Sequence, residues 1–244
     1  MPEPTPPTPP TPPTPQRRPA DPSALPVRIE GFELGPFGTN SYLVVCDDAL
    51  SCWVVDPSFE PEALIAAVKA CGKPLGAIVL THAHVDHIAG IRPLLRACGP
   101  APIYIHSAEA TWLDDPMANL SALSGLNITA PAATGLLADG DELSARTFAG
   151  TWTGSSIWHV LHVPGHSPGS VALYCPASAV AISGDALFAG SVGRTDFPGG
   201  SQSLLAASIR AKLYSLPDST QVLPGHGPAT TIAREKATNP YVRA

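Results

Sequence analysis

Residues 81–87 read Thr-His-Ala-His-Val-Asp-His and directly follow the apolar run Gly-Ala-Ile-Val-Leu, which is typical of a buried strand. Three imidazoles and a carboxylate at the end of such a strand are costly to bury unless a positive charge lies among them. On a loop that leaves a strand, His82 and His84 can point to one side while Asp86 and His87 curl round to another. A surface cluster of polar residues is the alternative, but the pattern favours a site for two adjacent divalent ions such as zinc, iron or manganese.

Three later segments repeat the pattern of a predicted strand followed by a metal-ligand type of residue. These residues are His166 after the run at 156–163, Asp185 after the run at 179–182 and His226 after the run at 221–223. Because an unpaired carboxylate or imidazole just past an apolar strand is costly, four strand ends are predicted to deliver metal ligands to one site. The other histidines, His106, His159 and His162, lack this setting. Asp56 also lies at a strand end, and the sequence is equally consistent with two roles for it: a hydrogen-bond partner of a metal ligand or a simple turn residue.

The chain is predicted to form one globular domain behind a proline-rich tail. Its 244 residues and 44% hydrophobic content support one sizeable core. Repeated Thr-Pro-Pro triplets predict that residues 1–26 are extended polyproline II or disordered, and a solvated spacer is favoured over a docking segment. Residues 27–244 would form the domain, in which strands and helices alternate as in an α/β fold. Strands are expected at 38–45, 51–55, 76–80 and 102–106, and helices at 61–71, 88–98 and 204–216.

Composition and cysteine usage exclude some classes of protein. A net charge of −6 with only 14% charged residues argues against a nucleic-acid surface. No apolar run approaches the roughly 20 residues that span a bilayer, and no secretory signal is recognised near the N-terminus. The five cysteines contain no Cys-x-x-Cys pair and fit buried thiols in a reducing compartment; they are Cys46, Cys52, Cys71, Cys98 and Cys175. We therefore expect a cytoplasmic protein with no nucleic-acid or membrane partner.

The motifs, taken in order, resemble those of the metallo-β-lactamase superfamily. They are Thr-His-x-His-x-Asp-His, Pro-Gly-His-x-Pro-Gly, Gly-Asp and Pro-Gly-His-Gly-Pro, and the resemblance covers residues 27–243. It implies an αββα sandwich, with two mixed sheets back to back, helices outside and two divalent metal ions at one edge, zinc being favoured over iron or manganese. It also implies which residues hold each ion: His82, His84 and His166 the first, Asp86, His87 and His226 the second, with Asp185 bridging them.

Within the superfamily, three further motifs look like those of the glyoxalase II-like (hydroxyacylglutathione hydrolase-like) enzymes, in particular the short single-domain bacterial kind. They are Asn40-Ser41-Tyr42, Gly193-Arg194-Thr195-Asp196-Phe197-Pro198 and Asn239-Pro240-Tyr241. True β-lactamases of this fold lack the last histidine of the first motif and often carry cysteine in place of Asp185, which disfavours that activity here. The long glyoxalase II enzymes grip glutathione with an extra C-terminal helical domain. No such domain is recognised before Ala244, so loose selectivity for the thiol is expected.

The resemblance therefore implies a dinuclear hydrolase of small thioesters of the S-lactoylglutathione type, with a small-molecule thioester as its substrate. Asp86 would hold the second ion and, as the catalytic residue, orient the attacking water. Arg194 either binds a substrate carboxylate or is an ordinary surface arginine.

Two other functions remain open. The persulfide dioxygenases resemble this chain at residues 193–197, and they would use one iron on His82, His166 and Asp185. They resemble it less at Pro224-Gly225-His226-Gly227-Pro228, which is of the hydrolase type. A non-enzymatic metal-binding scaffold has less support, because seven ligands around two ions leave open coordination positions that a structural site would close.

Overall fold

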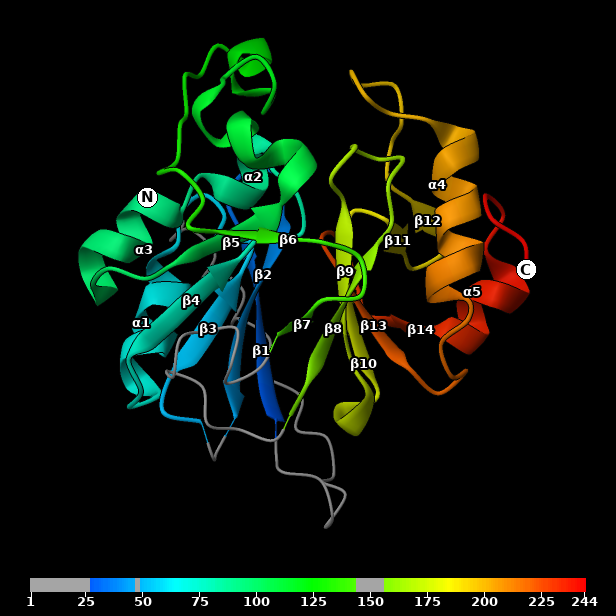
Figure 1. Cartoon of the computed structure of the whole chain (residues 1–244), viewed down its shortest axis with the longest axis horizontal. Helices are drawn as coiled ribbons and strands as arrows, with labels where there is room; N and C mark the ends of the chain where they lie inside the picture. Colours follow the sequence, from blue (N-terminus) through cyan, green and yellow to red (C-terminus); the bar gives the residue numbers. More distant parts are fainter. Residues whose placement is uncertain (1–26, 47–48, 144–155) are drawn as a thin grey trace, which may run out of the picture.

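The computed structural model describes residues 27–46, 49–143 and 156–244, which form a sandwich of two six-stranded sheets (Figure 1). Helices cover the outer face of each sheet, with α1 and α3 on one side and α4 and α5 on the other (Figure 1). The predicted αββα architecture is therefore confirmed. The proline-rich segment 1–26, with its predicted extended or disordered state, lies outside the described residues.

The first sheet has the strand order β1-β2-β3-β4-β5-β6, antiparallel as far as β3 and parallel from β3 onward. Its strands are β1 (Val27–Leu34), β2 (Thr39–Cys46), β3 (Cys52–Val55), β4 (Leu75–Val79), β5 (Ile103–His106) and β6 (Gly135–Leu137). Parallel neighbours need crossover connections, and these carry α1 (Glu62–Ala70), α2 (Val85–Ile88), α3 (Ile91–Cys98), η1 (Ser107–Asp114) and η2 (Ser121–Ser124). Every residue of β4 is buried, as expected for a central parallel strand covered on both faces.

The second sheet has the order β14-β13-β10-β9-β8-β7, with one parallel pair, β10 and β13. Its strands are β7 (Glu142–Leu143), β8 (Trp158–His162), β9 (Val171–Cys175), β10 (Val180–Gly184), β13 (Gln221–Pro224) and β14 (Thr230–Thr231). The connections and the outer layer are η3 (Pro176–Ser178), the hairpin β11 (Leu187–Phe188) and β12 (Ser191–Val192), α4 (Gln202–Ser208), η4 (Ile209–Leu213) and α5 (Ile232–Thr238). Both sheets are mixed, as expected.

The two sheets pack through one apolar core. At its centre Trp53 and Trp158 meet edge to face, with ring centroids 5.1 Å apart, and both are almost fully buried. Further clusters lie between each sheet and its outer helices. Because the strands are fixed on both faces by this packing, the loops that leave them start from rigid positions.

Two expected helices differ from the structure in detail. The helix expected at 88–98 begins at Ile91, as α3, and a separate short helix, α2, ends at Ile88. The break lies at Gly90, whose N–H donates to Pro57 O at 2.9 Å and where a side chain would collide with Ser58 O. The helix expected at 204–216 begins at Gln202, capped by the Ser201 hydroxyl, and widens into a π-turn at η4. No disulfide joins the cysteines, all five of which lie in the described ranges.

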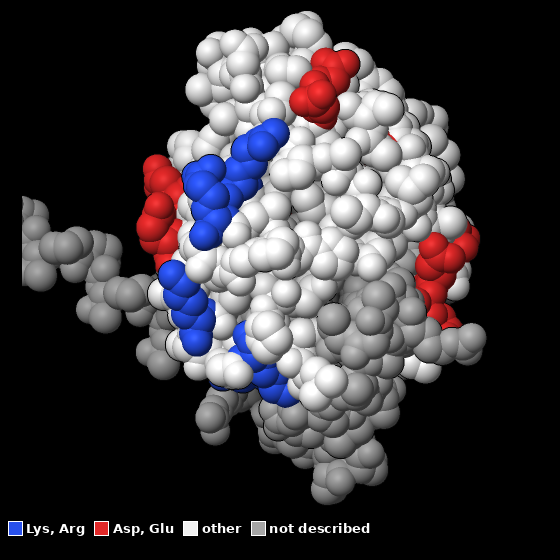
Figure 2. Space-filling view, turned by 60° about the vertical axis from the view of Figure 1, so that its left-hand side comes forward, with Lys and Arg blue, Asp and Glu red and all other residues white. Residues whose placement is uncertain are grey.

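Charged side chains are sparse on the surface. Figure 2 shows a face that is mostly uncharged: Lys and Arg lie toward its left and lower left, and separate patches of Asp and Glu lie at the left edge, at the top and on the right. Across the described part of the chain, the helices are all too short or too polar to cross a bilayer.

Candidate metal centre

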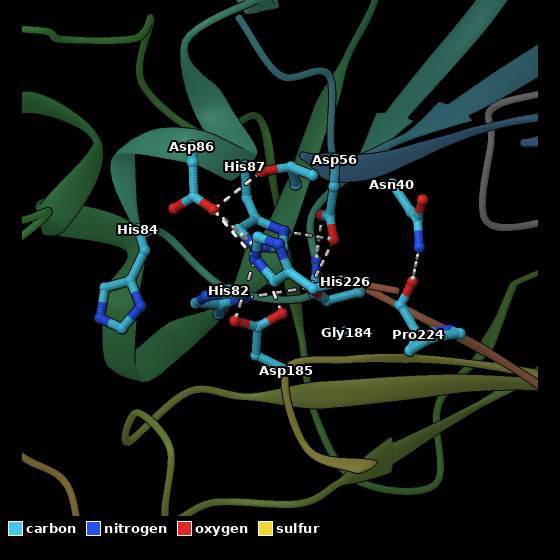
Figure 3. Close-up of polar contacts among 12 residues, drawn as sticks. Asn40, Asp56, His82, His84, Asp86, His87, Gly184, Asp185, Pro224 and His226 are labelled. Atoms are coloured by element: carbon cyan, nitrogen blue, oxygen red, sulfur yellow. Dashed lines mark hydrogen bonds and ion pairs between the residues drawn. The ribbon is translucent and has the colours of Figure 1, made fainter. Parts of the chain in front are cut away.

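The loops that follow β4, β8, β10 and β13 converge at one edge of the sandwich and bring the predicted ligands together. Each of the seven side chains has a nitrogen or oxygen within 3.6 Å of another member of the set: His82, His84, Asp86, His87, His166, Asp185 and His226. Figure 3 shows Asp86, His87, Asp185 and His226 directed toward one another. Three groups of possible ligands emerge: a first group of His82, His84 and His166, a second group of Asp86, His87 and His226, and an overlapping third group of Asp56, His82 and His87.

The first group consists of His82, His84 and His166. His166 Nε2 lies 3.2 Å from His82 Nε2 and 2.9 Å from His84 Nδ1. His166 Nδ1 lies 2.8 Å from Arg194 O and donates to it, which leaves a lone pair on Nε2. Burial lowers the pKa of His82 and of His166, and lowers the pKa of His84 to about 3, so that all three rings are neutral near pH 7.

These three nitrogens fit a bound cation. Neutral imidazoles that turn lone pairs toward one another repel unless a positive charge lies between them. Donors held about 2.0–2.1 Å from a tetrahedral ion stand about 3.3 Å apart, close to the separations seen here. The donor set and its spacing therefore suit a divalent ion of the zinc or iron type.

The second group combines His87 and His226 with Asp86 and Asp185. His226 Nε2 lies 3.2 Å from Asp86 Oδ2, and His87 Nε2 lies 3.4 Å from both Asp86 Oδ2 and Asp185 Oδ1. His87 Nε2 and Asp185 Oδ1 are buried and have no hydrogen-bond partner. A second cation bound between these two atoms would give each of them the partner that it lacks.

Charge balance supports the same interpretation. Burial alone would lower the pKa of His87, but the carboxylates of Asp86, Asp185 and Asp56 raise it well above its ordinary value. Burial raises the pKa of Asp86, but His87 and His226 together lower it by more, so the pKa falls below its ordinary value and this carboxyl group is ionised. Among the described residues, no Lys or Arg forms an ion pair with these three carboxylates. The pocket therefore concentrates negative charge where a cation would sit.

Asp185 lies between the two groups. Its Oδ2 is 3.6 Å from His166 Nε2, and its Oδ1 is 3.4 Å from His87 Nε2. The backbone of Gly225 passes so close that a Cβ there would overlap the Asp185 carboxylate and lie 2.9 Å from His87 Cε1. This close approach explains why a glycine precedes His226 in the Pro-Gly-His motif.

Asp56 proves to be a partner of the ligands rather than a simple turn residue. It accepts hydrogen bonds from Thr81 N at 2.7 Å, Thr81 Oγ1 at 2.5 Å and His87 Nδ1 at 2.9 Å (Figure 3). The last bond keeps a proton on His87 Nδ1 and directs Nε2 at the second group, where Nε2 could bind a cation once it gives up its own proton. Asp56 is 1% exposed and has a φ of 50°, which the surrounding bonds hold in place.

The start of β2 holds the His226 loop. Asn40 Nδ2 donates to Pro224 O at 3.0 Å and to Gly227 O at 2.8 Å, and Tyr42 Oη donates to Pro224 O at 2.6 Å. Thr39 Oγ1 donates to Asp86 Oδ2 at 2.9 Å. Asn40 and Tyr42 thus hold the His226 loop through backbone carbonyls, and Figure 3 shows the contact between Asn40 and Pro224.

Glu109, on η1, is a supporting residue that sequence reasoning missed. It is 0% exposed, and its two carboxylate oxygens accept from Ala83 N and Gly169 N, each at 2.6 Å. Ala83 lies between His82 and His84, and Gly169 ends the His166 loop. One buried carboxylate therefore joins the two loops that form the three-histidine group. The sequence signal is a single glutamate just after a predicted strand, which does not reveal such partners.

The remaining candidates lie outside the two groups. His106 and His162 stack on each other with ring centroids 4.1 Å apart, and His159 lies 4.0 Å from Glu142. Arg194 lines the cavity that opens beside the ligands, but Asp196 holds its Nε and Nη2, each at 2.7 Å.

The chain belongs to the metallo-β-lactamase superfamily, because the model of that family matches residues 34–226. Among curated relatives, it is 40% identical to the probable metallo-hydrolase YqgX of Bacillus subtilis, over 86% of this chain and 94% of the relative. It is 32% identical to the hydroxyacylglutathione hydrolase GloC of Haemophilus influenzae, over 89% of this chain and 99% of the relative. These relatives support a metal-dependent hydrolase.

Solved structures agree with this family. The chain is 41% identical to BLEG-1, described as a B3 metallo-β-lactamase, with a TM-score of 0.80 over 89% of this chain and all of the other. It is also 41% identical to TTHA1623 in a di-iron-bound form, with a TM-score of 0.74 over 87% of this chain and all of the other. ETHE1 from Myxococcus xanthus is 27% identical, with a TM-score of 0.68 over 87% of this chain and 83% of the other.

Proposed function

We propose that this protein is a dinuclear metal-dependent hydrolase of small thioesters, similar to the glyoxalase II enzymes. The observation that carries the proposal is the second ligand group, in which His226 Nε2 lies 3.2 Å from Asp86 Oδ2 beside the orphaned His87 Nε2. A single ion on His82, His166 and Asp185 would leave the buried His87 Nε2 without a partner. The relationship to GloC, a hydroxyacylglutathione hydrolase, supports a thioester as the substrate.

The proposed ligand assignment follows the two groups. His82, His84 and His166 would hold one divalent ion, Asp86, His87 and His226 the other, and Asp185 would contact both. Zinc suits these donors, although the di-iron form of TTHA1623 makes iron a close alternative. When bound, such ions would supply an activated water and a positive charge for the oxyanion that develops on the substrate carbonyl.

The protein's own groups then position the reactants. Asp86 lines the cavity, and Thr39 fixes its Oδ2, so its carboxylate can accept a proton from a water and orient it toward a carbonyl carbon. A thiolate leaving group needs little protonation, because a free thiol has a pKa of about 8.5. Arg194 is the candidate for binding a substrate carboxylate, which would have to displace Asp196 from its Nε and Nη2.

Persulfide oxidation is the second candidate, because ETHE1 shares the fold and because His82, His166 and Asp185 lie together as one iron site would require. Elemental analysis of protein purified without added metal separates the two. Two ions per chain support the hydrolase, and a single iron supports the dioxygenase.

Activity assays should run in parallel. We expect thiol release from S-lactoylglutathione and no oxygen uptake with glutathione persulfide. Oxygen uptake with the persulfide, without thiol release from any thioester, would replace the hydrolase proposal by the dioxygenase. A chromogenic cephalosporin belongs in the same series, because BLEG-1 is described as a β-lactamase. Faster cleavage of the cephalosporin than of any thioester would also contradict the proposal.

We also propose that residues 27–244 act as one domain, that the protein works in the cytoplasm, and that its partner is a small-molecule substrate. The family match from 34 to 226 supports the first of these, and the small cavity beside the ligands supports the last.

A further inference from the structure

The cavity beside the ligand groups has a polar floor and apolar walls. Its volume is about 450 Å³, and His84, Asp86, His166, Asp185 and His226 form one side of it. The other lining residues are mostly apolar, with Ser124 and Arg194 as the exceptions: Phe37, Val85, Leu120, Leu123, Phe188, Val192 and Phe197. A substrate whose carbonyl reaches the ligand groups must therefore lay the rest of its structure against apolar side chains.

The cavity offers no unpaired cation among its described lining residues. Arg194 is the one Lys or Arg there, and Asp196 accepts hydrogen bonds from its Nε and its Nη2, each at 2.7 Å. The guanidinium also lies over the ring of Phe197, 4.0 Å from its centroid, which fixes its plane. An anionic substrate group would have to break this bidentate pair, whereas an apolar group can pack beside it.

One wall of the cavity contains a residue with a strained backbone conformation. Leu120 has a φ of 68°, a left-handed conformation that is unusual for any residue but glycine. The preceding residue, Asn119, is fully buried, and its side-chain Nδ2 donates to Trp112 O and Ile128 O. The backbone carbonyl of Asn119 accepts a hydrogen bond from Val85 N at 2.9 Å. Val85 follows His84 in the first motif. The apolar wall is thus tied directly to the ligand loop.

Leu123, on the short helix η2, extends this wall to the rim of the cavity. It is 61% exposed, and Phe37 on the other side is 48% exposed. Large apolar side chains that border a reactive cavity and face solvent together indicate a binding surface for an apolar group.

We propose that this cavity binds the apolar acyl chain of the substrate, so that the preferred substrates are thioesters of unsubstituted, medium-length acyl groups rather than of small hydroxy acids. The inference rests on the proposed thioester hydrolysis and names its substrate class. In the reaction, water adds to the thioester carbonyl, the C–S bond breaks, and the products are a fatty carboxylate and a thiol. The thiol portion would extend toward solvent.

The test uses thioesters of one small neutral thiol, N-acetylcysteamine, with acetyl, butyryl, hexanoyl and octanoyl groups. We expect kcat/KM to rise by about fourfold for each added methylene until the cavity is filled, mainly through a lower KM. S-lactoylglutathione should be the poorer substrate. A flat or falling series, with S-lactoylglutathione cleaved best, would overturn the acyl-chain proposal and leave the hydrolase proposal standing. If no thioester is cleaved at all, both fail.

Two matched variants locate the binding surface. Leu123→Asp should flatten the chain-length dependence, whereas Leu136→Asp should leave it unchanged, because Leu136 is also 61% exposed but lies on β6, outside the cavity lining. Calorimetry with a non-hydrolysable octyl thioether on metal-free protein gives a readout without turnover. Its binding should be weakened by Leu123→Asp alone, and equal effects of the two variants would contradict the assignment.

Discussion

Replacing Glu109 by glutamine tests whether a single buried carboxylate joins the two loops of the three-histidine group. Its two oxygens accept backbone N–H groups of Ala83 and Gly169, each at 2.6 Å. Glutamine has the same shape, but its NH2 group would face one of these donors instead of accepting from it. The variant therefore loses one bond outright and leaves a buried N–H without an acceptor.

The expected magnitude follows from these bonds. Hydrogen bonds to a charged group contribute about 1.5–3 kcal/mol each, so the two together stabilise the fold by about 3–6 kcal/mol. Burial raises the pKa of Glu109, although bonds from Ser167, Gly169 and Ala83 lower it, so the ionised form is held at some cost. We therefore expect Glu109→Gln to lower the free energy of unfolding by about 2 kcal/mol, near the low end for one lost bond.

Metal binding gives the sharper readout. Ala83 lies between His82 and His84, and Gly169 ends the His166 loop. The Glu109→Gln variant should therefore also increase the distances between the facing ring nitrogens of these three histidines. Loss of a residue that orients ligands typically lowers metal affinity by about 10–100-fold. The affinity can be measured by competition with a chromophoric chelator, alongside unfolding of the metal-free and metal-loaded forms.

Glu235→Gln is the matched control. Glu235 is also 0% exposed and accepts from Gly190 N, Thr230 Oγ1 and Asn239 Nδ2, none of which belongs to a proposed ligand. It should lose stability but keep its metal affinity. Equal affinities for the two variants would show that Glu109 contributes only to stability, and the positioning argument would be wrong.

Three further predictions concern the ligands and the tail. Asp185→Asn should lose most activity and much of the second metal ion, and unchanged stoichiometry by elemental analysis would contradict the bridging role. Burial lowers the pKa of His84 from an ordinary value of about 6.5 to about 3. Between these two pH values, His84 is protonated in the unfolded chain but neutral in the folded protein. The stability that depends on neutral His84 is present above about pH 6.5 and is lost as the pH falls toward 3. When the pH is lowered from 7 to 4.5, the melting temperature of the metal-free His84→Gln variant should therefore fall less than that of the metal-free wild type. Deleting residues 1–18 should leave the melting temperature and turnover unchanged, because such a composition buries no core, and a clear fall in either would refute this.

The strand ends could be predicted from the sequence because the relevant signals are local. An apolar run of strand length that is followed within a few residues by His or Asp indicates both a strand and a metal ligand at its end, as at His166 and Asp185. Burial of these side chains without partners would be so costly that their presence already implies a cation. The seven residues consequently lie close together at one edge of the sandwich, and their role as metal ligands stays a prediction.

The supporting residues could not be predicted in the same way. The partners of Glu109 are backbone N–H groups 26 and 60 residues away, and backbone groups leave no mark in a sequence. Asp56 looked equally like a turn residue, and only its contacts with Thr81 and His87 decide between the two roles. The pairing of Arg194 with Asp196 likewise depends on how the loop folds back.

The site therefore divides its tasks between two sets of residues, and this division can be tested directly. Glu109 and Asp56 contact the ligand loops, whereas Leu123 borders the cavity and is 61% exposed. Because Leu123 is exposed at the rim of the cavity and its side chain forms no hydrogen bond, a change there should leave the buried hydrogen bonds of the ligand loops intact. Glu109→Gln should weaken metal binding but keep the dependence of KM on acyl-chain length, and Leu123→Asp should do the reverse. If Leu123→Asp lowered the metal content as much as Glu109→Gln does, the wall and the ligand loops would be one coupled unit, joined through the Asn119–Val85 hydrogen bond.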